Sequence, residues 1–70
     1  MVQQRTSLAV LRFYLNLSQV DLAKQVGTSR SAISLIERRL LRPSPGLQVR
    51  LAEALGADLR QLRAAQGWQG

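Results

Sequence analysis

The chain contains 70 residues, 46% of them hydrophobic, and has a formal net charge of +6. This length allows a single domain, 1–70, with a small core, and the apolar content is too high for a disordered tail. Because the sequence has neither cysteine nor histidine, it excludes disulfides, thiolate metal sites and the usual catalytic groups, so we expect no metal, no cofactor and no enzyme.

The first part of the chain predicts two short helices. The first carries apolar residues at helical spacing after a serine or threonine that can cap it, and an asparagine can end it. The second covers 19–26, begins with a shortened capping box and stops at a glycine. The residues expected to cap or end these helices are Thr6 or Ser7, Asn16, Ser18 with Asp21, and Gly27.

Three further helices are predicted in the second part. The third begins at Arg30 and is broken by the two prolines of segment 42–45, because the residue before a proline avoids the helical region. The expected caps and stops are Ser29, Ser44 with Pro45, Gly56 and Asp58. We expect a core over about 6–63 and a flexible or dimer-contacting tail over 64–70. No useful strand-like alternation is present, so the predicted fold class is all-α.

The stretch 17–37 has the spacing of a helix-turn-helix. Such a motif needs two helices that cross steeply through a turn of three or four residues, often containing glycine. Gly27 supplies that position, and Ala23 stands where a larger side chain would push the helices apart. The residues expected to anchor both helices on the core are Leu22, Val26, Ile33 and Ile36.

These motifs resemble the lambda-repressor-like helix-turn-helix domains of phage repressors, Cro proteins and their bacterial relatives. The resemblance covers about residues 8–62. It is strongest from Leu-Ser-Gln at 17–19 through Ile-Glu-Arg at 36–38, then in Arg-Pro-Ser at 42–44 and Leu-Ala-Glu-Ala-Leu-Gly at 51–56. It implies a compact five-helix bundle whose second and third helices form the helix-turn-helix, with the third entering the major groove of double-stranded DNA.

The resemblance also implies two sets of DNA contacts. The base-reading candidates, at the start of the recognition helix and one turn later, are Arg30, Ser31, Ser34 and Leu35. The phosphate-binding candidates are Gln19, Ser29, Arg38, Arg39 and Arg42. The charge of +6 agrees with nucleic-acid binding, although arginine enrichment can also follow from GC-rich codons. The alternative for each set is a solvated helix face or a solvated basic loop.

Two further features come from the comparison with these relatives. Arg12 and Glu37 match a pair that in some relatives forms a structural ion pair between helix one and the recognition helix, the alternative being direct phosphate binding by Arg12. Relatives usually carry a glycine after the Glu-Arg pair, where this chain has Arg-Leu-Leu at 39–41. We therefore expect the recognition helix to run on by a turn, or the loop to pack its leucines inward. Phe13 and Tyr14 replace residues that are usually polar.

The expected function is sequence-specific transcriptional regulation, as a repressor that binds a two-fold operator as a homodimer. Relatives commonly pair near the fifth helix and the loop after the recognition helix. The candidates for this interface, each of which could instead be ordinary core, are Leu40, Leu41, Leu59, Leu62 and Trp68. The alternative function is a protein-interaction module, such as an antitoxin or phage factor that binds a toxin or host protein, with or without DNA binding.

The cellular location follows from the absence of hydrophobic segments. No apolar run in the sequence is long enough for a membrane span, and residues 1–6 do not resemble a signal peptide. We therefore expect a cytoplasmic protein with no membrane partner, and no small-molecule ligand is evident.

Overall fold

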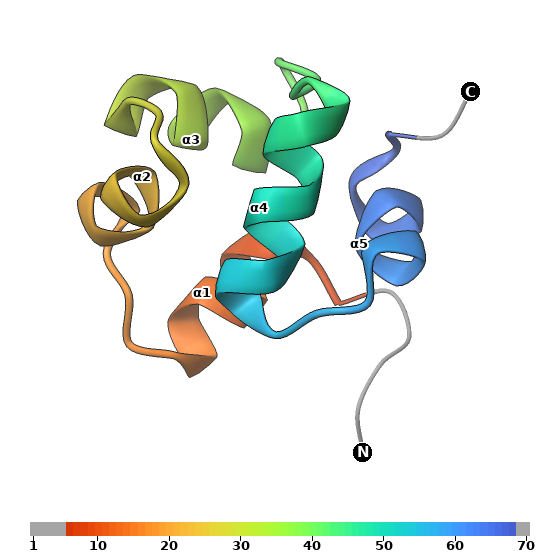
Figure 1. The fold of residues 1–70 in the computed structure, drawn as a ribbon, viewed down its shortest axis with the longest axis horizontal. Coiled ribbons are helices and arrows are strands. Elements are labelled where there is room, and N and C mark those ends of the chain that lie inside the picture. The colour runs from red at the N-terminus through yellow and green to blue at the C-terminus, as the bar shows by residue number, and fades with distance from the viewer. Residues whose placement is uncertain (1–5, 69–70) are drawn as a thin grey trace.

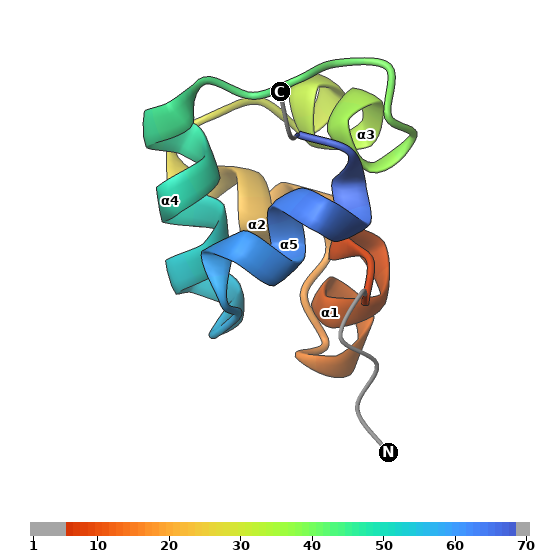
Figure 2. The ribbon, with the colours of Figure 1, turned by 90° about the vertical axis from the view of Figure 1, so that its right-hand side faces the viewer.

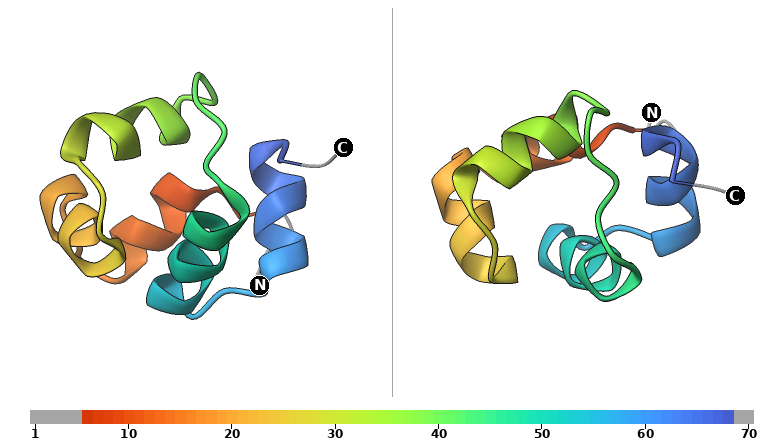
Figure 3. Two further views of the ribbon diagram at one scale, coloured as in Figure 1. Left: turned by 45° about the horizontal axis from the view of Figure 1, so that its top comes forward. Right: turned by 90° about the horizontal axis from the view of Figure 1, so that it is seen from above.

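The computed structural model describes residues 6–68 and contains, within that range, only α-helices. They are α1 (Leu8–Tyr14), α2 (Gln19–Val26), α3 (Arg30–Glu37), α4 (Pro45–Leu55) and α5 (Leu59–Gln66). α4 lies at the centre, between the α2–α3 pair and α5, and α1 lies below them (Figure 1). Views from above show α3 on the outside of the molecule, joined to α4 by the loop 38–44 (Figure 3). The predicted all-α class and five-helix bundle are confirmed.

Each helix begins at a serine or aspartate that caps it. The side-chain oxygen of the cap accepts a hydrogen bond of 3.0–3.4 Å from the backbone N–H three residues later, which satisfies one of the free amides of the first turn. The caps are the residues predicted from the sequence, namely Ser7, Ser18, Ser29, Ser44 and Asp58.

All five helices also end in the same way. A residue with left-handed φ, between 56° and 76°, follows the helix, and the next residue donates its N–H to the carbonyl five positions earlier at 2.8–3.1 Å. This is the Schellman motif, which satisfies carbonyls that the helix leaves free. The left-handed residues are Asn16, Gly27, Arg39, Gly56 and Gly67. Glycine and asparagine adopt this conformation readily, so the arginine is the exception.

One apolar core unites the five helices. α2 packs against α3 and α4, and α5 packs against α4 and α1. Apolar side chains that are at most 2% exposed come from every helix and from the residue after Gly67; they are Leu8, Leu22, Val26, Ile33, Ile36, Leu51, Leu62 and Trp68. Because α2 and α3 are both fixed to this core, the outer side of α3 is held in a defined orientation.

The core extends beyond residue 63, where the sequence predicted a flexible or dimer-contacting tail. α5 continues to Gln66, and the left-handed Gly67 turns the chain so that Trp68 packs inward with 2% of its surface exposed. The prediction of a flexible or dimer-contacting tail is therefore wrong for 64–68, and residues 69–70 lie outside the described range. The physical reason is that Gly67 ends a helix, and the residue after such a glycine commonly makes an apolar contact with that helix.

The capping box of α2 makes the start of this helix sensitive to acid. The Asp21 carboxylate accepts a bond of 3.1 Å from the Ser18 N–H, and the Ser18 hydroxyl accepts one of 3.0 Å from the Asp21 N–H. The bond from the Ser18 backbone is the main cause that lowers the pKa of Asp21 from its ordinary 3.8, and the Ser18 side chain and Lys24 also lower it. A depressed pKa means that the stabilisation is present above the unfolded value and is lost as the pH falls through the folded value.

We therefore expect the difference in melting temperature between the protein and its Asp21→Ala variant to shrink below about pH 4. Melts followed by circular dichroism at neutral and acid pH measure this difference. Asp21→Asn is the matched control, because it keeps an acceptor oxygen without a titratable charge. A difference that stays constant through the acid range would contradict the role given to the ionised carboxylate.

Candidate nucleic-acid interface

α2 and α3 form the helix-turn-helix that the sequence predicts. α2 ends at Val26, and Ser29 caps α3, so that the turn between the two helices is short. Gly27 has a φ of 73°, and a Cβ built on it would meet nothing within 4 Å. The glycine is therefore required by its backbone conformation rather than by lack of space. Ala23 is 3% exposed, as expected for a small residue at the place where the helices approach each other.

α3 presents one face to the core and leaves the rest of its surface to solvent. Ile33 and Ile36 are fully buried and lie three positions apart, as expected for one face of a helix. The predicted base-reading residues occupy other positions, with Arg30 and Ser31 exposed and Ser34 and Leu35 partly buried. Arginine and serine side chains at the amino-terminal end of this helix are thus accessible to a ligand as large as a DNA duplex.

Two of the predicted phosphate ligands are held by bonds within the domain. The Ser29 hydroxyl accepts from the Ala32 N–H at 3.1 Å, and the Gln19 Nε2 donates to Glu37 Oε1 at 3.0 Å. A hydroxyl also carries a proton of its own, and an amide nitrogen carries two. Each side chain can therefore donate one further hydrogen bond to a phosphate oxygen.

Arg12 and Glu37 form an ion pair that joins α1 to the end of α3. Arg12 Nε lies 2.6 Å from Glu37 Oε2, and Arg12 Nη2 lies 3.3 Å from Glu37 Oε1, so the contact is bidentate. The side chains are 12% and 8% exposed. Arg12 Nη1 also donates to the Leu17 carbonyl at 2.8 Å. Because Gln19 also donates to the Glu37 carboxylate, the network links α1, α2 and α3. The guanidinium of Arg12 makes its hydrogen bonds within the domain.

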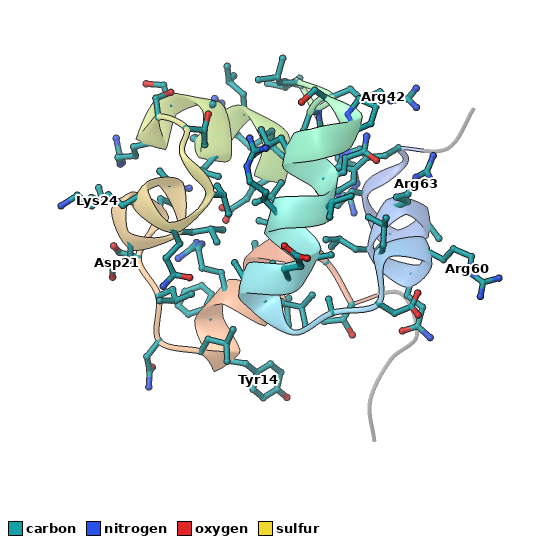
Figure 4. The ribbon with its side chains drawn as sticks, in the orientation of Figure 1. Tyr14, Asp21, Lys24, Arg42, Arg60 and Arg63 are labelled. Atoms are coloured by element: carbon teal, nitrogen blue, oxygen red, sulfur yellow. The ribbon has the colours of Figure 1, made fainter. Side chains whose placement is uncertain are left out.

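The remaining predicted phosphate ligands lie in the loop after α3. Arg38, Arg39 and Arg42 are all exposed. Arg38 Nε donates to the Ser34 carbonyl at 3.5 Å and Arg39 Nη2 to the Ala65 carbonyl at 2.9 Å; a guanidinium has five N–H donors, so both retain others. Arg42 lies at the upper end of the molecule with α3, and Tyr14 projects from the opposite end (Figure 4).

Arg39 itself takes the place of the glycine that usually ends the recognition helix. α3 stops at Glu37, and Arg39 adopts a φ of 62°. The Leu40 N–H then donates to the Leu35 carbonyl at 2.9 Å. Both expectations from the sequence are wrong here, because the helix does not run on and the two leucines are exposed, Leu40 by 67% and Leu41 by 41%. The left-handed residue ends the helix whatever its side chain, at a cost in backbone strain.

The predicted dimer residues separate into two groups. Leu62 and Trp68 are 1% and 2% exposed, so they belong to the core of the monomer and cannot contact a second copy; their assignment to an interface is corrected. Leu59 is partly buried against the same core. Leu40 and Leu41 are the members of the set that remain exposed.

Two residues near this interface were missed in the sequence. Arg50 of α4 donates from Nε to the Val26 carbonyl at 2.9 Å, which ties α4 to the end of α2 beside the turn. Gln66 is 2% exposed and contacts the backbone of both α1 and α3. Nothing in the local sequence marks either residue, because each bond joins positions at least 24 residues apart.

Residues 6–68 contain no group of three or more carboxylates that could hold a metal ion, and no helix among them is long and apolar enough to cross a membrane.

The comparison with known protein families gives one result that agrees with this geometry. The helix-turn-helix domain family matches residues 5–66, which is most of the chain and includes all five helices. The searches of curated proteins and of solved structures gave no match. The paired helices α2 and α3 and the extent of the family match together show that the chain belongs to the helix-turn-helix domain family.

Proposed function

We propose that the protein is a sequence-specific transcriptional regulator that acts in the cytoplasm as a repressor and binds a two-fold operator as a homodimer. Membership of the helix-turn-helix family indicates a DNA-binding regulator. The observation that carries the specific proposal is the exposed start of α3, where Arg30 and Ser31 project beside a turn fixed to the core. The first residues of a recognition helix contact base edges in the major groove.

The charges of the domain support this orientation on DNA. Arg38, Arg39 and Arg42 are exposed in the loop that directly follows α3. Arginines beside a recognition helix can bind the phosphates that flank the groove, which sets affinity and salt dependence, whereas the groove contacts set sequence choice. In this proposal Ser29 and Gln19 donate to phosphates from the starts of α3 and α2.

The first test is selection of bound duplexes from a random pool, followed by anisotropy titrations on the selected duplex and on a scrambled one at about 150 mM salt. A clear preference for the selected duplex is expected. Half-sites related by two-fold symmetry and about 34 Å apart would support the dimer. Equal affinity for both duplexes would end the claim of specific readout.

Arg30→Ala should weaken binding to the selected duplex by about 5- to 150-fold, the effect of losing a bidentate guanine contact worth about 1–3 kcal/mol. Binding to the scrambled duplex should change much less, because non-specific affinity comes from phosphates. The matched control is Arg60→Ala, which removes the same charge from the exposed side of α5 (Figure 4). Equal losses for the two variants, or equal losses on both duplexes, would contradict base reading by Arg30.

The homodimer in this proposal uses the exposed leucines of the loop after α3. Leu40 and Leu41 are 67% and 41% exposed, and exposed apolar clusters commonly mark partner surfaces. Sedimentation of the protein and of a Leu40→Ser, Leu41→Ser double variant would measure the effect. The variant should remain folded and shift from dimer to monomer, whereas unchanged sedimentation would exclude these residues.

A second candidate function, a protein-interaction module, is favoured by a different surface. Phe13 and Tyr14 are 74% and 81% exposed and lie with Val10 around a shallow hollow at the end of α1. This end lies away from α3 (Figure 4), so a protein could bind it while α3 is on DNA. A pull-down after nuclease treatment, repeated with Phe13→Ser, tests the idea. A stoichiometric partner that is lost with the variant would support it, and no partner would count against it.

A further inference from the structure

We propose that the last turn of α5 positions the basic loop after the recognition helix, and that Gln66 is the residue through which it does so. This inference rests on the proposed DNA binding, and it names a positioning residue that the sequence did not reveal. We call the Gln66 side chain and the Ala65 carbonyl the α5 clasp.

Gln66 holds the end of α3 and the start of α1 with one buried amide. The side chain is 2% exposed. Its Oε1 accepts from the Leu8 N–H at 2.9 Å, and its Nε2 donates to the Ile36 carbonyl at 3.1 Å. The Leu8 amide lies in the first turn of α1, where the helix supplies no acceptor, and the Ile36 carbonyl lies in the last turn of α3, where its other donor is the Arg39 N–H just beyond the helix. Gln66 therefore fixes two helix ends that are far apart in the sequence.

Arg39, in the loop after α3, binds the second member of the α5 clasp, the Ala65 carbonyl. Its Nη2 donates to the Ala65 carbonyl at 2.9 Å, and its backbone N–H donates to the Ile36 carbonyl at 3.0 Å. Ile36 and Arg39 are thus each bonded to neighbouring residues of α5, one through its backbone and the other through its side chain. The last turn of α5 rises toward α3 and the loop that follows it (Figure 2).

These bonds hold the end of α3 and the loop that follows it, and the proposed DNA binding requires this loop to be ordered. Arg39 holds a left-handed backbone that an arginine adopts only at a cost, and such a conformation persists where the surroundings fix it. Arg38 and Arg39, whose guanidinium groups are proposed to bind phosphates, are the first two residues of this loop. If the loop is ordered before DNA arrives, less conformational entropy is lost on binding.

Gln66→Met is the decisive variant, because a methionine side chain fills a similar space and forms neither of the two hydrogen bonds of the Gln66 amide group. The logarithm of the DNA association constant falls linearly with the logarithm of the salt concentration. We expect this slope to become shallower by about 0.9 for each phosphate contact that becomes disordered. One or two such contacts correspond to an affinity loss of about 5- to 30-fold at roughly 0.15 M salt. In the free protein, amide exchange at Leu40 should be accelerated by a larger factor than exchange in the middle of α4 at Leu51, where the change measures the loss of global stability alone.

Two control variants separate positioning from loss of stability. Ala54→Gly weakens α4 without touching the clasp, and Gln61→Met makes the same chemical change on the exposed side of α5. Both should keep the salt slope of the parent protein when all measurements are made at a temperature where every variant is folded. Gln66→Asn, whose amide is one methylene too short to reach both partners, serves if Gln66→Met does not fold.

The outcomes distinguish this inference from the proposed function. If the parent protein binds no duplex, the proposed function fails, while the exchange measurement still decides whether Gln66 orders the loop. If the parent binds and a folded Gln66 variant keeps its slope, its affinity and its Leu40 exchange, the positioning role is overturned. Equal changes in Ala54→Gly would also overturn it, because they would reflect stability alone.

Discussion

Replacing Trp68 with alanine should reduce the free energy of unfolding by about 3–5 kcal/mol, the range for removing a large aromatic side chain from a packed core. The indole is 2% exposed and belongs to the single core cluster. A domain of this size commonly has only about 3–5 kcal/mol in total, so the variant should be largely unfolded at physiological temperature. Urea unfolding followed by circular dichroism measures the loss.

The control for this substitution is Val49→Ala, which shortens an apolar side chain of α4 that is 42% exposed. Its unfolding free energy should stay within about 0.5 kcal/mol of the parent. The sequence has one tryptophan, so its fluorescence reports directly on this part of the chain. Emission typical of water-exposed indole in the native protein, or a loss for Trp68→Ala no larger than that for Val49→Ala, would show that residue 68 is not part of the core.

Replacing Glu37 with alanine should cost a similar amount, about 3–5 kcal/mol, because it leaves a partly buried guanidinium without its counter-charge. Arg12 is 12% exposed and keeps only the Leu17 carbonyl as a hydrogen-bond acceptor in the variant. The Gln19 amide loses its acceptor as well. Chemical unfolding of the variant measures the cost, with Glu53→Ala, at an exposed position of α4, as the control.

The double variant Arg12→Met, Glu37→Leu tests whether the cost comes from the unpaired charge. Replacing both partners of a buried ion pair with apolar residues is often neutral or stabilising, so the double variant should be more stable than Glu37→Ala alone. If it is as unstable as the single variant, the loss comes from packing rather than from charge. A loss below about 1 kcal/mol for Glu37→Ala would place the pair among ordinary surface ion pairs.

The elements of the fold could be predicted because their signals are local. A serine or aspartate caps each helix, and its partner N–H lies only three residues away. Gly27 and Gly56 end their helices as predicted, since few other residues adopt a left-handed backbone without cost. The helix-turn-helix followed from the same short-range signals together with the small residue at position 23.

The rest could not be predicted because it depends on contacts between distant segments. Gln66 and Trp68 lie on either side of Gly67 near the end of the given sequence, a pattern that suggested a flexible tail. Gln66 is buried where it bonds to α1 and α3, which lie 30 or more residues earlier, and Trp68 is buried in the core cluster to which all five helices contribute. Arg39 gave no local signal, because an arginine rarely adopts the conformation that the loop requires.

The bond between Leu8 and Gln66 joins positions 58 residues apart, and this separation has a consequence for how the chain folds. Closing a long loop costs entropy that one hydrogen bond cannot repay by itself. The bond therefore stabilises only a chain whose inner helices have already assembled and drawn the two segments together. We therefore expect the helices to form early from local contacts, and the first and last of them to dock late.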